Sequence, residues 1–438
     1  MPLTRRFSQL AIANIVSNLM VPLAGIVDTA FLGHLAEIHY LAGVALATLI
    51  FNVIYWSFGF LRMGTTGMTA QAMGRGDRSE VLLVGLRNAL IALGLGVIIL
   101  LLQVPLRLIG FALLSGTPDV QAAGVDFYNA RIWGSPAVLL NYVLLGWFLG
   151  RSQGRSVILL SMVANFGNVV LDYWFINRLG WASAGAGLAT ALSQYAMLMI
   201  GLGLLIAEVT VGEVKAVWPH LWQPQALQGL FLLNRDILIR TFALVISFAL
   251  FTNFSSILGE TVLAVNTLLL QVVTLAAYFI DGIAFATETF AGEFYAQGDR
   301  RQLQTLIRLA GGTSLVLGVG FALGFALLPQ GLFGIMTSHT VLLNQVESYV
   351  WWLLPVLGFG AIAFMLDGYF LGLTAGAALR NSTLLASTIG FLPLAWLALQ
   401  LKNVQLLWLA LTCFMAMRAI TLSWGVSATL SSHPSPKT

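Results

Sequence analysis

The sequence predicts an all-α polytopic membrane protein of about twelve transmembrane helices. Of its 438 residues, 58% are hydrophobic and only 9% are charged, and the mean hydropathy is +0.89. Soluble proteins carry roughly 25% charged residues. Apolar stretches of about 20 residues, each long enough to cross ~30 Å of hydrocarbon, recur along nearly the whole chain. Little length is left for a water-soluble domain.

Each predicted span is an apolar run between short polar loops. In chain order the spans cover residues 8–33, 41–72, 80–104, 120–149, 156–177, 184–208, 227–258, 262–294, 304–334, 342–372, 383–401 and 404–430. The first follows Arg5 and Arg6 and is too long for a signal peptide, so we expect it to stay uncleaved. The most polar internal stretch, 208–225, is the expected linker between an N-terminal lobe (residues 1–217) and a C-terminal lobe (residues 218–438).

Basic residues alternate between the loops. One set of loops holds Arg5, Arg6, Arg75, Arg78, Arg87, Arg151, Arg155, Lys215, Arg235, Arg240, Arg300, Arg301, Arg308 and Arg380, whereas the other holds chiefly Arg107, Arg131, Arg178 and Lys402. This pattern predicts that both termini are cytoplasmic, in what we expect to be a bacterial inner (plasma) membrane. It also explains the pI of about 9.3 without nucleic-acid binding. The single cysteine, Cys413, excludes an intrachain disulfide.

The chain repeats itself once. Gly76-Asp77-Arg78 matches Gly298-Asp299-Arg300, and Phe148-Leu149-Gly150 matches Phe370-Leu371-Gly372, both 222 residues apart. Six spans per half with the same topology predict two pseudo-symmetric six-helix bundles around a central cleft. Transporters of this design bind their substrate between the halves and alternate access by rocking them.

Polar residues form stripes along three spans of the first half. At alternating steps of three and four residues stand Asn14, Asn18, Val21, Gly25 and Asp28 in the first span, Ser161, Asn165, Asn168 and Asp172 in the fifth, and Ser183, Gly187, Thr190 and Gln194 in the sixth. Such spacing places each set on one helical face. Lipid cannot satisfy these groups, so we expect the stripes to face one another or a wet cavity.

The two aspartates are the strongest candidates for function. A carboxylate near the bilayer centre costs roughly 2.5–3.5 kcal/mol on insertion scales. Amide and hydroxyl side chains such as Asn18, Asn165 and Thr190 could simply join helices, but Asp28 and Asp172 would do so at an avoidable cost. Desolvation and a neighbouring carboxylate both favour the protonated form of a carboxyl group. Such a group can exchange a proton, or a cation in its place, across the membrane.

The second half does not copy these acids. The repeat places Leu250 and Leu394 at their positions. Instead, the eighth span carries one polar face, with Gln271, Asp281 and Glu288 among its members. These could form a second-lobe site, or the acids could pair with a base such as Arg62, whose counterpart in the repeat lies between them. Asp367 in the tenth span is a weaker candidate.

Several motifs resemble the multidrug and toxic compound extrusion (MATE) family, in particular its DinF branch. They are Ile26-Val27-Asp28-Thr29-Ala30-Phe31-Leu32-Gly33, Phe60-Leu61-Arg62-Met63-Gly64-Thr65-Thr66-Gly67, Asn168-Val169-Val170-Leu171-Asp172-Tyr173, Asp281-Gly282 and Leu366-Asp367-Gly368-Tyr369. The resemblance covers nearly the whole chain and implies two six-helix bundles forming a V-shaped cleft. It also implies that Asp28, Asn168, Asp172 and Thr190 form a cation-linked network.

The sequence thus predicts an antiporter that exports organic cations in exchange for H⁺, with Na⁺ as second choice. Either ion would bind at Asp28 and Asp172; no other metal, no cofactor and no enzymatic activity are expected. The substrates would be small, amphipathic and cationic, and the protein a monomer. The alternative is a flippase for lipid-linked saccharides or other amphipathic lipids. A pyrophosphate substrate would call for several Arg or Lys in the cavity, whereas intramembrane acids dominate here.

Overall fold

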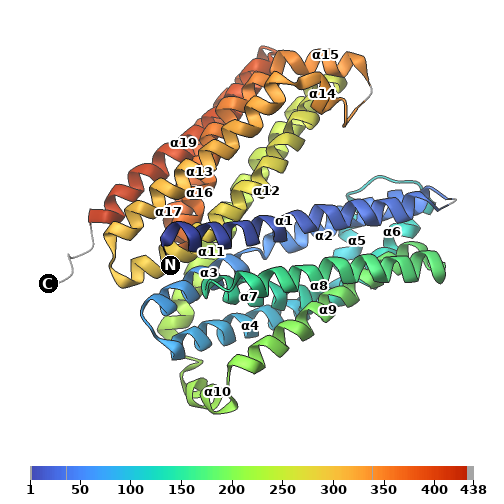
Figure 1. The fold of residues 1–438 in the computed structure, drawn as a ribbon. Coiled ribbons are helices and arrows are strands. Elements are labelled where there is room, and N and C mark those ends of the chain that lie inside the picture. Colours follow the sequence, from blue (N-terminus) through green and yellow to red (C-terminus); the bar gives the residue numbers. More distant parts are fainter. Residues whose placement is uncertain (1, 36, 338, 432–438) are drawn as a thin grey trace. The chain divides into compact units, whose positions relative to one another are not determined.

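The computed structural model describes residues 2–35, 37–337 and 339–431, and every regular element in these ranges is a helix (Figure 1). Twelve helical segments are long and apolar enough to cross a membrane, which confirms the predicted spans. They are α1 (Leu3–Gly33), α2 with α3 (His39–Ser57, Phe60–Gly74), α4 (Arg78–Leu101), α6 with α7 (Pro118–Arg131, Ser135–Gly150), α8 (Gly154–Asp172, continued by a π-helix at Tyr173–Arg178), α9 (Ala182–Glu208), α11 (Pro224–Leu258), α12 (Glu260–Gln297), α13 (Arg300–Leu327), α15 with α16 (Thr340–Tyr349, Leu353–Gly372), α17 with α18 (Gly376–Leu385, Leu392–Gln400, joined by a π-helix at Ala386–Phe391) and α19 (Val404–Ser431).

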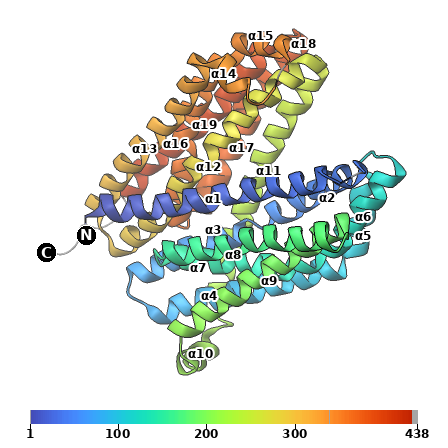
Figure 2. The same ribbon diagram turned by 45° about the vertical axis from the view of Figure 1, so that its right-hand side comes forward.

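Three shorter helices connect these spans. They are α5 (Gln103–Ala112), α10 (Val211–Val217) and α14 (Pro329–Phe333). Figure 2 shows α10 beyond the end of α9, next to the end of α4. The predicted linker at 208–225 therefore contains a helix of its own.

The chain packs as two compact units. One is Val16–Gly229; the other joins the chain up to Ile15 with the chain from Leu230 onward. The first half of α1 thus packs with the C-terminal spans, where the Asn14 amide donates to the carbonyl oxygen of Gly282 on α12 at 3.5 Å. The two lobes predicted on either side of the polar linker, 1–217 and 218–438, stay a prediction.

Matching caps show the repeat in local structure. Asp77 precedes α4 and accepts a hydrogen bond from the Glu80 amide, and Asp299 precedes α13 and accepts one from the Gln302 amide, both at 3.0 Å. Asp at this position satisfies a helix-end N–H that lacks a partner. Gly76 and Gly298 stand before these caps with φ of 69° and 71°, a left-handed conformation that favours glycine.

Matching glycines set the closest helix crossings. A Cβ on Gly146 of α7 would lie 2.5 Å from the Arg62 carbonyl oxygen of α3. A Cβ on Gly368 of α16 would lie 2.1 Å from the Ala284 carbonyl oxygen of α12. Both partners are 222 residues apart, so the two units use the same contact. Because lipid supplies no hydrophobic force between helices, such close backbone approach carries much of their packing.

We predict that Gly368→Ala destabilises the unit that contains α12 and α16. The new methyl group would displace backbone rather than a flexible side chain, at a cost of about 1–3 kcal/mol. Gly358→Ala is the matched control, because it lies on the same helix and its new methyl group would have no atom within 4 Å. Thermal unfolding in detergent should show a lower midpoint for Gly368→Ala alone, and equal midpoints for the two variants would contradict the packing role.

Helix α10 begins with a capping box. Thr210 and Glu213 exchange hydrogen bonds between side chain and backbone, and Arg78 pairs with the Glu213 carboxylate at 2.6 Å. The Thr210 backbone N–H, and then Arg78, lower the pKa of Glu213 from 4.5 to about 2. Because the folded-state pKa is lowered, the carboxylate's contribution is present above about pH 4.5 and is lost as the pH falls towards 2.

We predict that Arg78→Gln raises the pKa of Glu213 but leaves it below 4.5, because the Thr210 N–H bond remains. Arg75→Gln, on the neighbouring turn, should leave this pKa at about 2. Carboxyl-carbon NMR of glutamate-labelled protein, titrated with acid, measures both. A Glu213 pKa that is the same in Arg78→Gln as in the parent protein would contradict the pairing.

Candidate functional site

A cavity of about 650 Å³ lies within the Val16–Gly229 unit. Helices α1, α2, α6, α7, α8 and α9 all contribute to its wall. Its polar lining residues are Asp28, Thr29, Thr48, Asn52, Tyr55, Trp56, Arg131, Asn141, Tyr142, Ser161, Asn165, Asn168, Thr190, Ser193 and Gln194. A volume of this size suits a drug-sized ligand. Members of all three polar stripes line it, among them Asp28, Asn168 and Thr190.

The two aspartates of the first half are neighbours. Asp28 lines the cavity on α1, and Asp172, fully buried at the end of α8, lies within hydrogen-bonding range of the Asp28 carboxyl group. Among the described residues, neither carboxylate oxygen of Asp172 has a hydrogen-bond donor, and Oδ1 of Asp28 also lacks one. Two carboxylates accept but do not donate, so they can bond only around a proton or a cation. A π-helix starts directly after Asp172, a distortion frequent at functional sites.

Asn168 and Thr190 join α8 to α9 beside this pair. The Thr190 hydroxyl donates to its own helix at the Ala186 carbonyl oxygen (3.0 Å), and the Asn168 amide nitrogen approaches the same hydroxyl at 3.5 Å. The amide nitrogen of Asn168 is thereby directed to Thr190, and its carbonyl oxygen is left to face elsewhere. Of the other candidates, Asn165 lines the cavity but donates to the Ser161 carbonyl oxygen at 2.7 Å.

Asn18 lies outside the set of described residues that line the cavity. It does have an interaction partner. The structure therefore brings together Asp28, Asp172, Asn168 and Thr190, with Asn165 at the wall, and does not add Asn18 to them.

Arg131 is the main cavity residue that the sequence did not single out. Its guanidinium lies over the rings of Phe51 (4.5 Å), Phe127 (5.5 Å) and Tyr55 (5.8 Å). Its Nε is buried without an acceptor among the described residues. It interacts electrostatically with Asp28 without a direct ion pair in the described part of the chain. The sequence could have identified Arg131 by its position, because it lies twelve residues into the expected span at 120–149.

The assignment of Arg87, Arg131 and Arg240 to loops is wrong, because all three lie within spans α4, α6 and α11. Each has an internal partner that offsets the cost of burying a cation. Arg87 donates to the carbonyl oxygens of Leu221 (3.1 Å) and His220 (2.8 Å). The guanidinium of Arg131 lies over aromatic rings, and that of Arg240 forms an ion pair with an acidic residue.

Asp367 is the acidic residue that pairs with Arg240, and its charge is neutralised by two arginines. In the unit containing α11, α16 and α19, Arg240 and Arg418 both form ion pairs with the buried Asp367 carboxylate. Arg418 is fully buried and was not predicted. Asp281 also lies in electrostatic range of both arginines. The open question about the second-half acids is therefore answered for Asp367, which is held by fixed bases.

The other second-lobe candidates are spread along α12. Glu288 is buried, Asp281 is half-buried and Gln271 is exposed. At 1.5 Å per residue, Gln271 and Glu288 are roughly 25 Å apart along the helix, too far for one small ligand. Arg62 belongs to α3 in the other compact unit. A second-lobe site at these residues stays a prediction.

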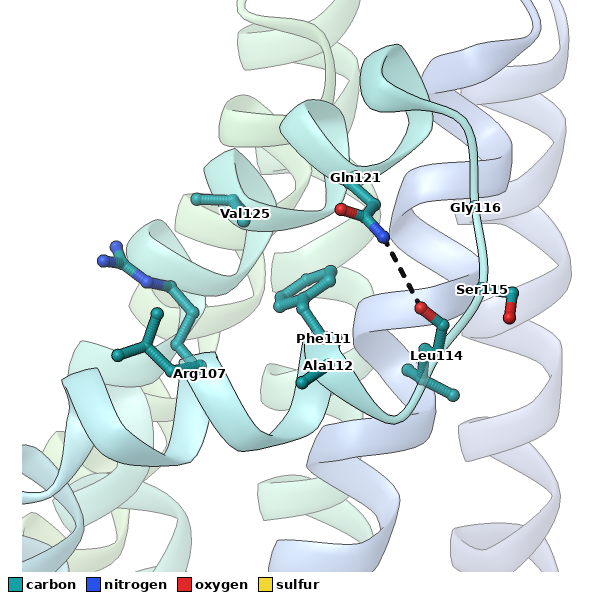
Figure 3. Close-up of a pocket in the computed structure, with 9 residues that line it drawn as sticks. Arg107, Phe111, Ala112, Leu114, Ser115, Gly116, Gln121 and Val125 are labelled. Atoms are coloured by element: carbon teal, nitrogen blue, oxygen red, sulfur yellow. Dashed lines mark hydrogen bonds between the residues drawn. The ribbon is translucent and has the colours of Figure 1, made fainter.

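A second hollow, of about 520 Å³, opens where α5 turns into α6. Figure 3 shows Arg107 on one side of it and the Gln121 amide directed to the Leu114 carbonyl oxygen, at 3.5 Å. Arg107 is bonded to Asn129 at 2.8 Å. The described residues that line this hollow include no carboxylate, so it does not compete with the Asp28 cavity as a cation site.

We predict opposite effects on stability for two Asp→Asn changes. Asp367→Asn would leave Arg240 and Arg418 buried without their carboxylate, which typically costs about 3–5 kcal/mol. Asp172→Asn removes a buried acid that has no fixed base and should leave the unfolding midpoint equal or higher. Thermal unfolding in detergent measures both. A midpoint that falls equally in the two variants would contradict the distinction between a paired and an unpaired acid.

The family model MatE matches two segments of the chain, residues 13–174 and 237–397. DNA damage-inducible protein F of Escherichia coli (strain K12) is 36% identical over 94% of this chain and 90% of that protein. The probable multidrug resistance protein NorM of Thermotoga maritima is 26% identical over 85% of this chain and 79% of its own length. The two matched segments agree with the internal repeat.

Solved structures show the same fold. A MOP superfamily transporter from Pyrococcus furiosus superposes with a TM-score of 0.86 at 18% identity, over 97% of this chain and 96% of that one. A multidrug resistance MATE family transporter in an outward-facing conformation gives the same values. By its sequence matches and its twelve membrane-spanning helices, this chain belongs to the MATE family of multidrug and toxic compound efflux transporters, as an integral multi-pass membrane protein.

Proposed function

We propose that the protein is an antiporter that exports amphipathic organic cations in exchange for protons, with Asp28 and Asp172 as the coupling pair. The observation that carries the proposal is the contact between the carboxyl group of Asp28, at the wall of a cavity of about 650 Å³, and that of the buried Asp172, with no ion pair to a base among the described residues. Family membership supports efflux. The likeness to a relative described as a probable multidrug resistance protein supports drug-like substrates.

Competition for one positive charge would couple the two movements. Two carboxylates in contact repel each other, so the pair is most stable when it holds one proton or cation. A proton shared between the oxygens meets this need, and so does an organic cation placed above the pair. Because either one displaces the other, the protein would carry substrate in one direction and the proton in the other.

Sodium remains the second choice of coupling ion. The carboxylate oxygens of Asp28 and Asp172, with the amide oxygen of Asn168, are hard donors of the kind that alkali and alkaline-earth cations prefer. A proton needs only the two carboxyl groups, and they are the groups whose oxygens lack donors. This difference favours the proton.

The driving force is adequate for a useful gradient. One elementary charge that moves down a potential of 100 mV yields about 2.3 kcal/mol. Fully coupled, this amount supports roughly a fiftyfold concentration ratio of a solute without net charge. Exchange of one proton for one singly charged cation moves no net charge, so the pH difference drives that export. The positive-inside pattern supports cytoplasmic termini, and the transported proton would then enter from the opposite side.

The coupling role predicts that Asp28→Asn and Asp172→Asn each abolish gradient-driven export while the protein still inserts and folds. Fluorescent-dye efflux from vesicles with an imposed pH gradient, or alternatively an Na⁺ gradient, measures this directly. Asp126→Asn, which changes an exposed acid on α6 outside the cavity lining, is the matched control and should transport like the parent protein.

Export that persists unchanged in both Asp28→Asn and Asp172→Asn would remove the coupling role from this pair. Export that responds to the Na⁺ gradient and not to the pH gradient would keep the pair and replace the ion. Loss in the Asp126→Asn control would show that the assay reports general damage.

A further inference from the structure

The cavity holds opposite charges at separate positions. Asp28 forms its acidic side. The fully buried Asp172 lies within hydrogen-bonding range of the Asp28 carboxyl group, outside the set of described residues that line the cavity. Arg131 enters from α6 and lies over the rings of Phe51, Phe127 and Tyr55. Arg131 and Asp28 interact electrostatically but form no direct ion pair within the described residues. Neither side chain therefore neutralises the charge of the other.

The arginine also has donors to offer. A guanidinium carries its N–H donors in its own plane, and its charge can lie over aromatic rings while donors bond another group. Its Nε is buried and lacks an acceptor among the described residues. The nearby Tyr55 hydroxyl is already engaged with the Ser135 hydroxyl at 3.1 Å. Arg131 also lines the cavity, so a carboxylate bound there would give its guanidinium an anionic partner.

The apolar part of the lining fits the rest of such a ligand. Trp56, Leu145 and Met197 line the cavity together with the charged residues. Aromatic and thioether side chains adapt to flat apolar molecules of varied shape. The combination of an acid pair, an arginine and an apolar wall is therefore complementary to a molecule that carries both signs of charge on an apolar frame.

We propose that the cavity selects amphipathic zwitterions, with Arg131 binding the substrate's carboxylate and the Asp28–Asp172 pair binding its cationic group. Arg131 is thus a specificity-determining residue in the substrate site. This inference rests on the proposed export function, because it names the substrate class of the same cavity. It differs from that function in requiring an anionic group on the substrate.

A matched pair of dyes tests the proposal. Rhodamine B carries a free carboxylate and a delocalised cation, and its ethyl ester keeps the cation and the frame but loses the anion. We expect the parent protein in nanodiscs to bind the acid at least as tightly as the ester, measured by fluorescence polarisation against empty nanodiscs. Arg131→Gln should weaken binding of the acid about tenfold or more, as expected for a lost charge-assisted hydrogen bond, and change binding of the ester by less than about threefold.

Two further variants control the result. Arg131→Lys keeps the positive charge and should restore part of the affinity for the acid, which a purely structural role in ring packing would not do. Arg107→Gln, at the hollow between α5 and α6, removes an arginine of the same unit outside the cavity and should change neither dye.

Each outcome decides the proposal. Equal losses for acid and ester in Arg131→Gln, or no loss for either, would overturn it. Binding of the ester but not of the acid by the parent protein would also overturn it, while leaving the proposed export of organic cations intact. Failure of the parent protein to bind either dye would contradict both.

Discussion

An acid pair without a fixed base, buried among apolar helices, is the interaction on which the rest of this structure depends. Asp172 is fully buried, and it touches Asp28 at the cavity wall. Repulsion between the two carboxylates makes the pair a receptor for one positive charge. In the exchange that we propose, the surrounding helices would have to keep this pair dry enough to bind a proton and open enough to release it.

The two compact units build different chemistry on one scaffold. Both use the same glycine crossings, at Gly146 on Arg62 and at Gly368 on Ala284. In one unit the principal buried acid, Asp367, is held by Arg240 and Arg418. In the other, Asp172 has no such base among the residues that the structure describes. Since a neutralised acid stabilises a fold and an acid without a fixed base can exchange ions, duplication has left one half better suited to stability and the other to exchange.

The sequence predicted the features that depend on the pattern of apolar residues and on the free-energy cost of burying a carboxylate. The twelve spans follow from runs of apolar residues, and the cost of burying an acid singled out Asp28 and Asp172. Their grouping with Asn168 and Thr190 was implied by the resemblance to the MATE family. What it missed were bases inside spans. Arg131, Arg240 and Arg418 look like loop charges or go unnoticed in a linear reading, because their partners, Phe51 and Asp367, are 80 residues away for the first and 127 and 51 residues away for the others. Asn18 shares the stripe of Asp28, but helical spacing alone does not show that it stays outside the cavity lining.

Proton release on substrate binding is the most direct test of the central claim. Purified protein in weakly buffered detergent solution is mixed with an organic cation near neutral pH, and a pH indicator counts the protons released for each cation bound. We expect release of up to one proton per bound cation in the parent protein and none in Asp172→Asn. Cation binding with no proton release from the parent protein, or undiminished release from Asp172→Asn, would contradict a coupling site at the Asp28–Asp172 pair.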